Sequence, residues 1–361
     1  MIRGKDMAKK KILYVVEALG GGVFTYIVDL ANELVNEFDM YIAYAVRPQT
    51  PSNYKEYFDK RINLIEVKSF CREIKPAQEL KAIKEVKAIA EEVKPDIIHL
   101  HSSKAGVIGR IAFNGKDIPL FYTPHGYSFL MKDCSKLKRT IYWLIEALFA
   151  KRTCTTISCS PGEHRETLKL TKCAVYVNNG INAEDLRLRL ANVKEEEHPF
   201  TVFTLGRICF QKNPSLFNSI AEKLPNIRFV WIGDGELRSE LKSENIEITG
   251  WVERDVALRK SINGDVFILT SLWEGLPISL LEAMYMKKPC VVSNVIGNND
   301  VIHNDDNGFV CDTVDDFVSA ITSAKGKALA EKAYEDLMSK YETKAQAKRY
   351  ANIYRGLKER A

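Results

Sequence analysis

The chain contains the run Thr270-Ser271-Leu272-Trp273-Glu274-Gly275-Leu276-Pro277-Ile278-Ser279-Leu280-Leu281-Glu282, which follows an apolar strand pattern at 265–270. Pro277 suits the start of a helix, because its missing N–H would be unpaired there in any case. The free N–H groups and partial positive charge of a helix start favour an anion such as a phosphate. The run therefore predicts a strand, an anion-binding loop that carries Glu274, and a helix whose Glu282 leans back toward that loop.

Short β-branched or aromatic runs alternate with helical periodicity along the rest of the chain. This alternation predicts parallel sheets built of β-α-β units, and 361 residues exceed the size at which one core usually keeps growing. We expect an α/β protein with two Rossmann-like, doubly wound parallel-sheet domains that face a central cleft. The predicted strands are 11–16, 62–67, 96–101, 119–123, 155–160, 174–177, 200–205, 228–232, 247–249, 265–270 and 289–293.

The domain boundary is predicted at a charged stretch, Lys194-Glu195-Glu196-Glu197, because a fresh strand pattern starts just after it. We place the first domain at 1–185, a linker at 186–199 and the second domain at 200–342. A polar helix at 343–361 follows. Its apolar stripe consists of Ala347, Tyr350, Ala351 and Tyr354.

Two cations follow the first strand of the second domain, in Gly206-Arg207-Ile208-Cys209-Phe210-Gln211-Lys212-Asn213. Arg207 and Lys212 are placed to neutralise a diphosphate, with charge-assisted contacts of roughly 1.5 to 3 kcal/mol each. The chain contains no D-x-D and no C-x-x-C sequence. We therefore expect protein cations in place of a metal ion, and no cofactor.

These residues resemble the retaining glycosyltransferases of GT-B fold, specifically the large family 4. The resemblance covers almost the whole chain, and its most specific element is Glu274 to Glu282, which matches the family's E-x7-E motif. Further matches are Gly206-Arg207 with Lys212, Gly233-Asp234-Gly235, Gly250-Trp251, His125-Gly126 and Asn179-Gly180-Ile181. One segment departs from the pattern, because Val295 to Asp300 stands where relatives often carry G-G-x-x-E, which leaves the phosphate contacts of that loop open.

The resemblance implies a role for each matching residue. Arg207 and Lys212 would hold the donor diphosphate, Glu282 the ribose hydroxyls and Glu274 the hydroxyls of the donor sugar. His125 would contact the sugar near the reacting carbon, so the catalytic candidates are His125, Glu274, Arg207 and Lys212. Further donor contacts are expected from Gly20, Gly21, Gly22, Gly206, Gly233, Trp251, Val252, Gly275 and Leu276. His99 and His101, which alternate on a strand, are expected to be structural.

The implied function is a metal-independent glycosyltransferase that retains anomeric configuration, with the donor diphosphate itself as the base. It would move a sugar from a nucleotide-sugar donor to a lipid-linked or oligosaccharide acceptor in polysaccharide or glycoconjugate biosynthesis. A UDP-sugar is the leading candidate for the donor. The first domain would face the acceptor, the second would hold the donor, and the last helix would cross back to the first domain. Two alternatives stay open: a GT-B-fold sugar-nucleotide epimerase and a non-catalytic nucleotide-sugar-binding subunit.

Charge is distributed unevenly along the chain. Residues 1–190 contain 30 Lys/Arg and 22 Asp/Glu, a net charge of +8, and the remaining residues carry −3, which together give the total of +5. The basic half suits an anionic partner such as a lipid headgroup, but a solvated lysine surface explains it equally well.

Residues 136–145 are basic and then aromatic, as in interfacial membrane helices, yet we expect a helix that faces the core. No apolar run is long enough to span a membrane, so we expect a cytoplasmic protein, with peripheral contact at the inner face of the plasma membrane as a hypothesis. Nucleic acid is not an expected partner, because the sequence shows no basic stripe with aromatic residues on which bases could stack.

Overall fold

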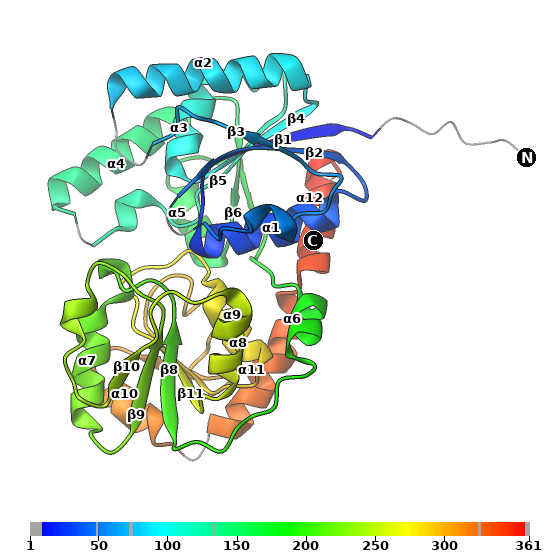
Figure 1. The fold of residues 1–361 in the computed structure, drawn as a ribbon. Coiled ribbons are helices and arrows are strands. Elements are labelled where there is room, and N and C mark those ends of the chain that lie inside the picture. The colour runs from blue at the N-terminus through cyan, green and yellow to red at the C-terminus, as the bar shows by residue number, and fades with distance from the viewer. Residues whose placement is uncertain (1–8, 48–49, 72–74, 133, 324–325, 358–361) are drawn as a thin grey trace, which may run out of the picture.

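The computed structural model describes residues 9–47, 50–71, 75–132, 134–323 and 326–357. It contains one sheet of seven strands and one of six, and every strand pair in both is parallel. The two sheets with their helices form two layered units, one above the other in Figure 1. This architecture confirms the predicted fold class.

The N-terminal half is built on the seven-stranded sheet, in the order β3-β2-β1-β4-β5-β6-β7. Its strands are β1 (Lys11–Leu19), β2 (Asp39–Val46), β3 (Asn63–Glu66), β4 (Ile97–His101), β5 (Leu120–Thr123), β6 (Thr155–Ser158) and β7 (Ala174–Tyr176). Its helices are α1 (Gly21–Leu34), η1 (Tyr54–Tyr57), α2 (Pro76–Val93), α3 (Ser103–Ala112), η2 (Ser128–Leu130), α4 (Lys136–Phe149) and α5 (Pro161–Leu168).

The C-terminal half is built on the six-stranded sheet, in the order β10-β9-β8-β11-β12-β13. Its strands are β8 (Thr201–Leu205), β9 (Arg228–Ile232), β10 (Ile246–Ile248), β11 (Val266–Leu269), β12 (Cys290–Ser293) and β13 (Phe309–Cys311). The helices are α6 (Ala183–Leu190), η3 (Phe210–Lys212), α7 (Pro214–Lys223), η4 (Arg238–Glu240), α8 (Arg254–Ile262), α9 (Ile278–Tyr285), α10 (Val314–Ile321), α11 (Gly326–Lys340) and α12 (Thr343–Tyr354).

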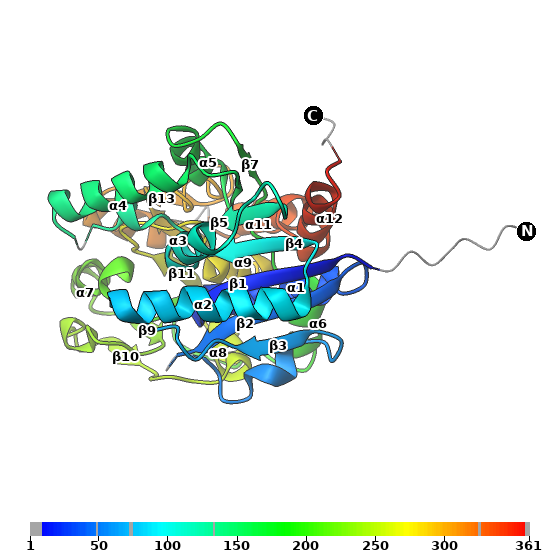
Figure 2. The same cartoon turned by 90° about the horizontal axis from the view of Figure 1, so that it is seen from above.

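Helices cover both faces of each sheet, so the central strands are apolar on both sides. On β1, Tyr14 and Val16 pack with α1 and α12, whereas Leu13 and Val15 pack with α2 and α3. In Figure 1, α2 lies above the first sheet and α1 below it, and Figure 2, which looks down from above, shows α2 on the near side. This two-sided burial explains why these strands read as continuous apolar runs and not as alternating ones.

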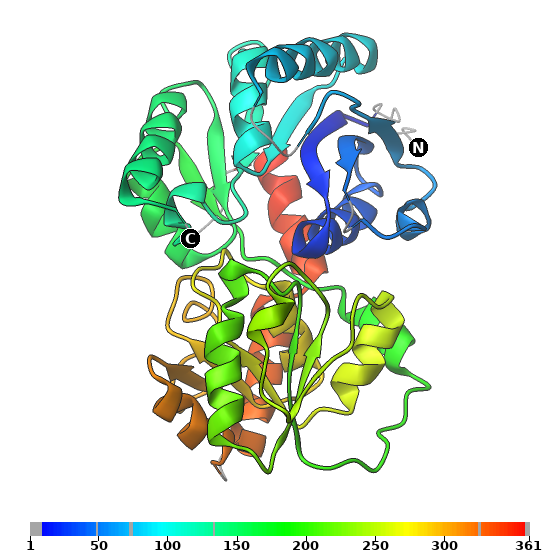
Figure 3. The same ribbon diagram turned by 60° about the vertical axis from the view of Figure 1, so that its left-hand side comes forward.

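The last helix, α12, packs on the N-terminal half although it follows α11 of the C-terminal half. Its stripe of Ala347, Tyr350, Ala351 and Tyr354 is buried in the same core as β1 and α1. The chain crosses between the halves at Ile181 and at Tyr341 to Thr343, and backbone hydrogen bonds join the two crossings: Ile181 N to Tyr341 O, and Thr343 N to Ile181 O, both 2.9 Å. Figure 3 shows the red α12 reaching from the lower half to the first sheet.

Three sequence expectations need revision. Strands β2 and β13 were not predicted, although Tyr41, Ile42 and Tyr44 in β2 favour a strand and β13 is as short as the predicted β7 and β10. Helix α6 starts at Ala183 and runs into the predicted linker 186–199, and the domain bounds themselves stay a prediction. The expectation that residues 136–145 face the core is wrong: α4 buries only Glu146 and exposes most of its apolar side chains.

Candidate active site

The chain order reverses between β1 and β4 in the first sheet, and between β8 and β11 in the second. Ligands of doubly wound sheets bind at such switch points, beyond the carboxyl ends of the strands. The segments that leave these strands carry Gly20 to Gly22, Gly206 to Lys212, and Thr270 to Pro277. Most of the predicted site residues therefore lie at the two switch points.

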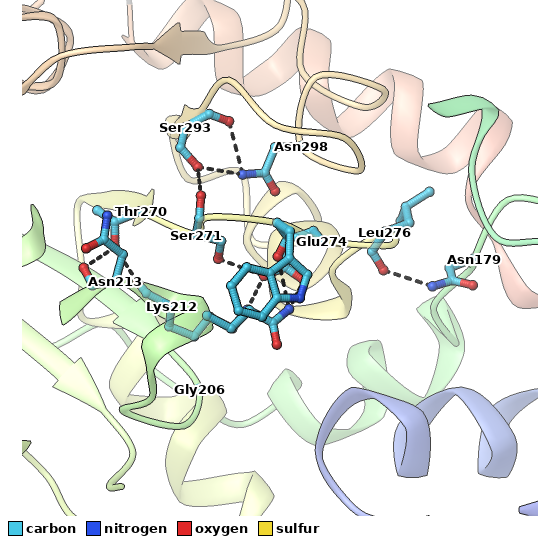
Figure 4. Close-up of polar contacts among 12 residues, drawn as sticks. Asn179, Gly206, Lys212, Asn213, Thr270, Ser271, Glu274, Leu276, Ser293 and Asn298 are labelled. Atoms are coloured by element: carbon cyan, nitrogen blue, oxygen red, sulfur yellow. Dashed lines mark hydrogen bonds and ion pairs between the residues drawn. The ribbon is translucent and has the colours of Figure 1, made fainter. Parts of the chain in front are cut away.

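Lys212 and Glu274 form an ion pair at the C-terminal switch point. Lys212 Nζ lies 2.7 Å from Glu274 Oε1, and both side chains are largely buried. Ser271 Oγ donates to the same carboxylate oxygen at 2.7 Å, and Gln211 Nε2 donates to Oε2 at 3.3 Å (Figure 4). Thr270 Oγ1 donates to Lys212 O at 2.7 Å, which ties the two loops together. The pair is thus fixed by contacts from both segments before any ligand binds.

The loop after Glu274 offers amide groups to a ligand. No hydrogen bond within the described ranges uses the N–H of Gly275 or Leu276. Asn179 of the N-terminal half donates from Nδ2 to Leu276 O at 2.8 Å, which holds the loop from the opposite side (Figure 4). A Cβ on Gly275 would lie 3.0 Å from Gly126 N and from Cys159 Sγ, so a larger residue would press the two halves apart by a few tenths of an ångström.

His125 lies on a turn directly beside Gly275, in a left-handed backbone conformation with φ of 55°. Glu163 holds this turn, because its Oε1 accepts the N–H of Gly126 at 2.6 Å and its Oε2 accepts the N–H of Cys159 at 2.8 Å. His125 Nε2 is 3.0 Å from His101 Nδ1. Burial raises the pKa of Glu163 and lowers the pKa of His125 to about 3. His125 is thus a neutral imidazole at physiological pH, positioned by His101 and Glu163.

Glu282 does not share a contact with Glu274. Its Oε1 forms an ion pair with Arg254 Nη2 at 2.8 Å, and Arg254 also donates to Thr25 Oγ1 on α1 at 3.3 Å. The ion pair lacks hydrogen-bond alignment, so in the described part of the chain the buried Oε1 has no hydrogen-bond partner. This oxygen can still accept a ligand hydroxyl. Arg254 also lines a cavity of about 410 Å³ between α1, η1, α6 and α8.

The remaining predicted donor residues are arranged around this centre. Arg207 forms an ion pair with Glu236 at 2.9 Å and not with the Lys212 cluster. A Cβ on Gly233 would lie 2.2 Å from Gly206 O, so the two strand ends touch only because residue 233 is glycine. Trp251 exposes 58% of its side chain beside Val252. Gly20 to Gly22 start α1, where a Cβ on Gly22 would contact Ile278 of α9 at 3.8 Å.

The loop that departs from the family pattern contacts the opposite half. Asp300 Oδ2 accepts the N–H of Gly162 at the start of α5 at 2.9 Å and that of Gly297 at 3.1 Å. Its Oδ1 lies 3.3 Å from Arg165 Nη2. Asp300 therefore caps a helix of the N-terminal half from the C-terminal half.

Sequence reasoning missed two residues that support the site, Arg254 and Glu163. It named His101 only as a structural residue and Asp300 only in the loop that departs from the family pattern. For Glu163 a local signal exists, because Ser160 stands three residues earlier as in a capping box, and Ser160 Oγ does accept the N–H of Glu163 at 3.1 Å. That signal predicts a helix start but not the contact with Gly126. Nothing local identifies Arg254 as the partner of Glu282.

Two family models match consecutive parts of the chain. The model described as glycosyltransferase family 4 matches residues 20–185, and the model of glycosyl transferases group 1 matches residues 187–345. The UDP-Gal:alpha-D-GlcNAc-diphosphoundecaprenol alpha-1,3-galactosyltransferase of Escherichia coli is 31% identical over 298 residues, which are 74% of this chain and 76% of that relative. The chain belongs to the group 1 glycosyltransferases.

Solved structures agree with this transferase in fold. The sucrose-phosphate synthase of Thermosynechococcus elongatus has a TM-score of 0.78 at 16% identity, and the match covers 96% of this glycosyltransferase and 99% of that chain. Anabaena Alr3699/HepE in complex with UDP-glucose has a TM-score of 0.76 at 17% identity, with 96% and 100% covered. Both show the GT-B fold.

Two features are absent from the described residues. None of the helices in those ranges is both long and apolar enough to traverse a bilayer. No cluster of three or more His, Cys, Asp or Glu side chains in the same ranges is arranged to hold a metal ion.

The buried histidines of the glycosyltransferase make its stability depend on pH. Burial lowers the pKa of His99, His101 and His125 in the folded state, while the unfolded chain takes up these protons near pH 6.5. The free energy of unfolding should therefore fall as the pH drops from about 6.5 toward 3, by about 1.4 kcal/mol per pH unit for each histidine that stays neutral. Urea unfolding at a series of pH values measures this slope.

Replacing His99 with phenylalanine should make the slope shallower, even though it also removes the 2.9 Å contact of His99 Nε2 with Thr123 Oγ1 and lowers stability at neutral pH. His303→Phe is the matched control, because the His303 side chain is exposed. An unchanged slope in His99→Phe would show that folded His99 accepts its proton at an ordinary pH.

Proposed function

We propose that this glycosyltransferase transfers a sugar from a UDP-sugar to a lipid-linked or oligosaccharide acceptor in polysaccharide or glycoconjugate biosynthesis, with retention of anomeric configuration. The observation that carries the proposal is the preformed Lys212–Glu274 pair at 2.7 Å beside the unused amides of Gly275 and Leu276. A cation and free N–H groups at one point suit a diphosphate, and the carboxylate suits sugar hydroxyls.

The proposed roles follow from the positions of the residues. Lys212 and Arg207 bind the diphosphate, Glu274 binds the donor sugar, and Glu282 accepts a ribose hydroxyl through the oxygen that lacks a hydrogen bond. The start of α1 at Gly20 to Gly22 and the turn of His125 approach the sugar from the N-terminal half. Gly206, Gly233, Trp251 and Val252 complete the donor side.

Retention and independence of metal belong to the same proposal. The diphosphate oxygen takes the proton of the acceptor hydroxyl as the glycosidic bond forms on the face from which the diphosphate leaves. His125 has a pKa of about 3, so it stays uncharged and serves as a hydrogen-bonding group at the sugar. Arg207 and Lys212 supply the positive charge that stabilises the leaving diphosphate.

The acceptor is proposed from chemistry and from relatives. The name of the Escherichia coli relative specifies a GlcNAc-diphosphoundecaprenol acceptor, and such an acceptor presents its sugar at a membrane surface. We therefore place the N-terminal half, at 1–185, on the acceptor side, and the donor on residues 200–342. The protein would act in the cytoplasm, in peripheral contact with the inner face of the membrane.

Nucleotide release from a panel of UDP-, GDP-, ADP- and TDP-sugars tests the proposal, with and without EDTA. We expect slow, EDTA-resistant release from a UDP-sugar, lowered at least about tenfold in Glu282→Ala and in Arg207→Ala. Arg228→Ala is the matched control, because Arg228 pairs with Glu247 on an exposed surface away from this centre. Release that depends on metal, or that survives both site variants, would contradict the proposal.

The same assay separates the two alternatives. A sugar-nucleotide epimerase would change the donor sugar without an acceptor, and NMR of the recovered nucleotide sugar would detect the new epimer. A non-catalytic subunit would bind a donor but release no nucleotide with any acceptor. For a transferase, NMR of the product should show the anomeric configuration of the donor retained.

A further inference from the structure

Helix α4 has an apolar face that points to solvent. Leu137, Ile141, Leu144 and Leu148 repeat at helical spacing with Ile145, and they expose between 36% and 72% of their side chains. These five residues are called the α4 face. No other helix in the described ranges exposes as many large apolar side chains.

The opposite side of α4 fixes this orientation. Glu146 is buried and accepts from Arg110 Nη2 of α3 at 2.8 Å and from Tyr122 Oη of β5 at 2.8 Å. Tyr142 packs against the adjoining core. Rotating the helix to hide its apolar face would expose these contacts and would bury unpaired charge, which is strongly unfavourable. The exposed α4 face is therefore a stable property of the fold.

The neighbouring elements leave the α4 face uncovered. Helix α4 packs on α3 and on η2. It lies at the outer edge of the N-terminal half in both Figure 1 and Figure 2. A face of this kind on the rim of a domain marks an interaction surface.

The charge around the α4 face indicates its partner. Residues 132–152 contain six basic and two acidic residues, and one of the acids is the buried Glu146. Lys132, Lys136 and Lys138 flank one end of the face, and Lys151 and Arg152 flank the other. Basic residues around an apolar helix face suit anionic lipid headgroups above acyl chains.

A second copy of the chain fits less well. Basic residues stand at both ends of α4, so pairing two α4 faces would bring like charges together in either orientation. A membrane surface covers the same apolar side chains and neutralises the charge. We infer that α4 docks this glycosyltransferase on an anionic lipid bilayer, with the α4 face in the interfacial region.

The inference rests on the proposed function, because docking would bring the acceptor-side half to a lipid-linked acceptor. The docking itself can be measured separately from the transfer. The full chain is floated with vesicles of phosphatidylglycerol mixed with phosphatidylcholine, and with phosphatidylcholine alone. The test variant is Leu144→Glu/Leu148→Glu. The matched control is Leu80→Glu/Leu188→Glu, because those leucines are 62% and 60% exposed on other helices.

We expect binding to the anionic vesicles that weakens with added salt, falls about tenfold or more in the test variant and is unchanged in the control. Thermal unfolding shows whether both variants fold like the parent chain. Any of three results would overturn the inference. The parent chain could fail to bind the vesicles, or the control variant could lose as much vesicle binding as the test variant. The third result is a salt-independent dimer in lipid-free solution that only the test variant disrupts.

Donor-dependent nucleotide release keeps the two proposals apart. The test variant should release nucleotide at the parent rate with a short water-soluble acceptor, because α4 contributes no residue to the donor site. Vesicle binding by a parent chain that releases no nucleotide would contradict the proposed function and leave the docking intact. Nucleotide release by a parent chain that does not bind vesicles would contradict the docking and leave the proposed function intact.

Discussion

Replacing Lys212 with alanine is expected to lower kcat/KM by about a hundred- to a thousandfold. One preorganised donor aimed at charge that develops in the transition state is worth about 2.7 to 4 kcal/mol. Lys212 meets that description, because Glu274 Oε1 holds its Nζ at 2.7 Å and Thr270 Oγ1 holds its carbonyl at 2.7 Å before any donor binds. The loss should appear mainly in kcat, as expected for a contact that strengthens as the diphosphate leaves.

The fold should survive this change, because Glu274 keeps its hydrogen bonds from Ser271 Oγ at 2.7 Å and Gln211 Nε2 at 3.3 Å. Lys223→Ala removes a lysine from an exposed ion pair with Asp315 in the same half and should leave the rate within about twofold. Steady-state kinetics and thermal unfolding of both variants measure the two effects. A folded Lys212→Ala enzyme with the parent kcat/KM would remove this lysine from the proposed site.

Replacing Glu146 with alanine is expected to lower the free energy of unfolding by about 3 to 5 kcal/mol, because it leaves a buried guanidinium without a counter-ion. Arg110 exposes only 2% of its side chain, and besides Glu146 its Nε donates to Gly106 O at 2.8 Å. Its guanidinium also lies 4.3 Å from the centre of the Tyr122 ring. None of these contacts replaces the lost negative charge. Urea unfolding at constant pH measures the difference.

The double variant Arg110→Met/Glu146→Leu tests the cause of that loss. Apolar residues of similar volume often replace a buried ion pair at little cost, so we expect its stability to return to within about 1 kcal/mol of the parent. Glu166→Ala, which breaks an exposed pair with Lys169, should cost less than about 1 kcal/mol. A double variant as unstable as Glu146→Ala would mean that packing or the lost hydrogen bond of Tyr122 Oη, and not the uncompensated charge, explains the loss.

The sequence predicted the local segments of this protein well. The alternation of strands and helices gave both parallel sheets, and the run from Thr270 to Glu282 gave a strand, a loop and a helix. Periodicity, a proline at a helix start and glycines at strand ends act over a few residues, so they can be recognised without a structure. Strand β13 was missed, although β7 and β10, which also have three residues, were predicted.

The partners within the site could not be predicted in the same way. Glu274 pairs with Lys212, 62 residues away, whereas Glu282 pairs with Arg254 on another helix. Asp300 reaches Gly162 over 138 residues, and Glu163 reaches Gly126 over 37. Such contacts depend on how the strands order themselves in each sheet and on how the two halves meet.

The sequence by itself thus determined the fold class and the residue types at the strand ends, because these follow from local patterns of apolar, glycine and charged residues. Only the tertiary structure decided which charges pair and which face of α4 meets solvent. The reason is burial: a helix that is apolar on one face normally turns that face inward, but the ion pair of Arg110 and Glu146 at 2.8 Å occupies the inner side of α4. Turning the leucines inward would separate Glu146 from the buried Arg110 and leave that guanidinium without its counter-ion, which is strongly unfavourable.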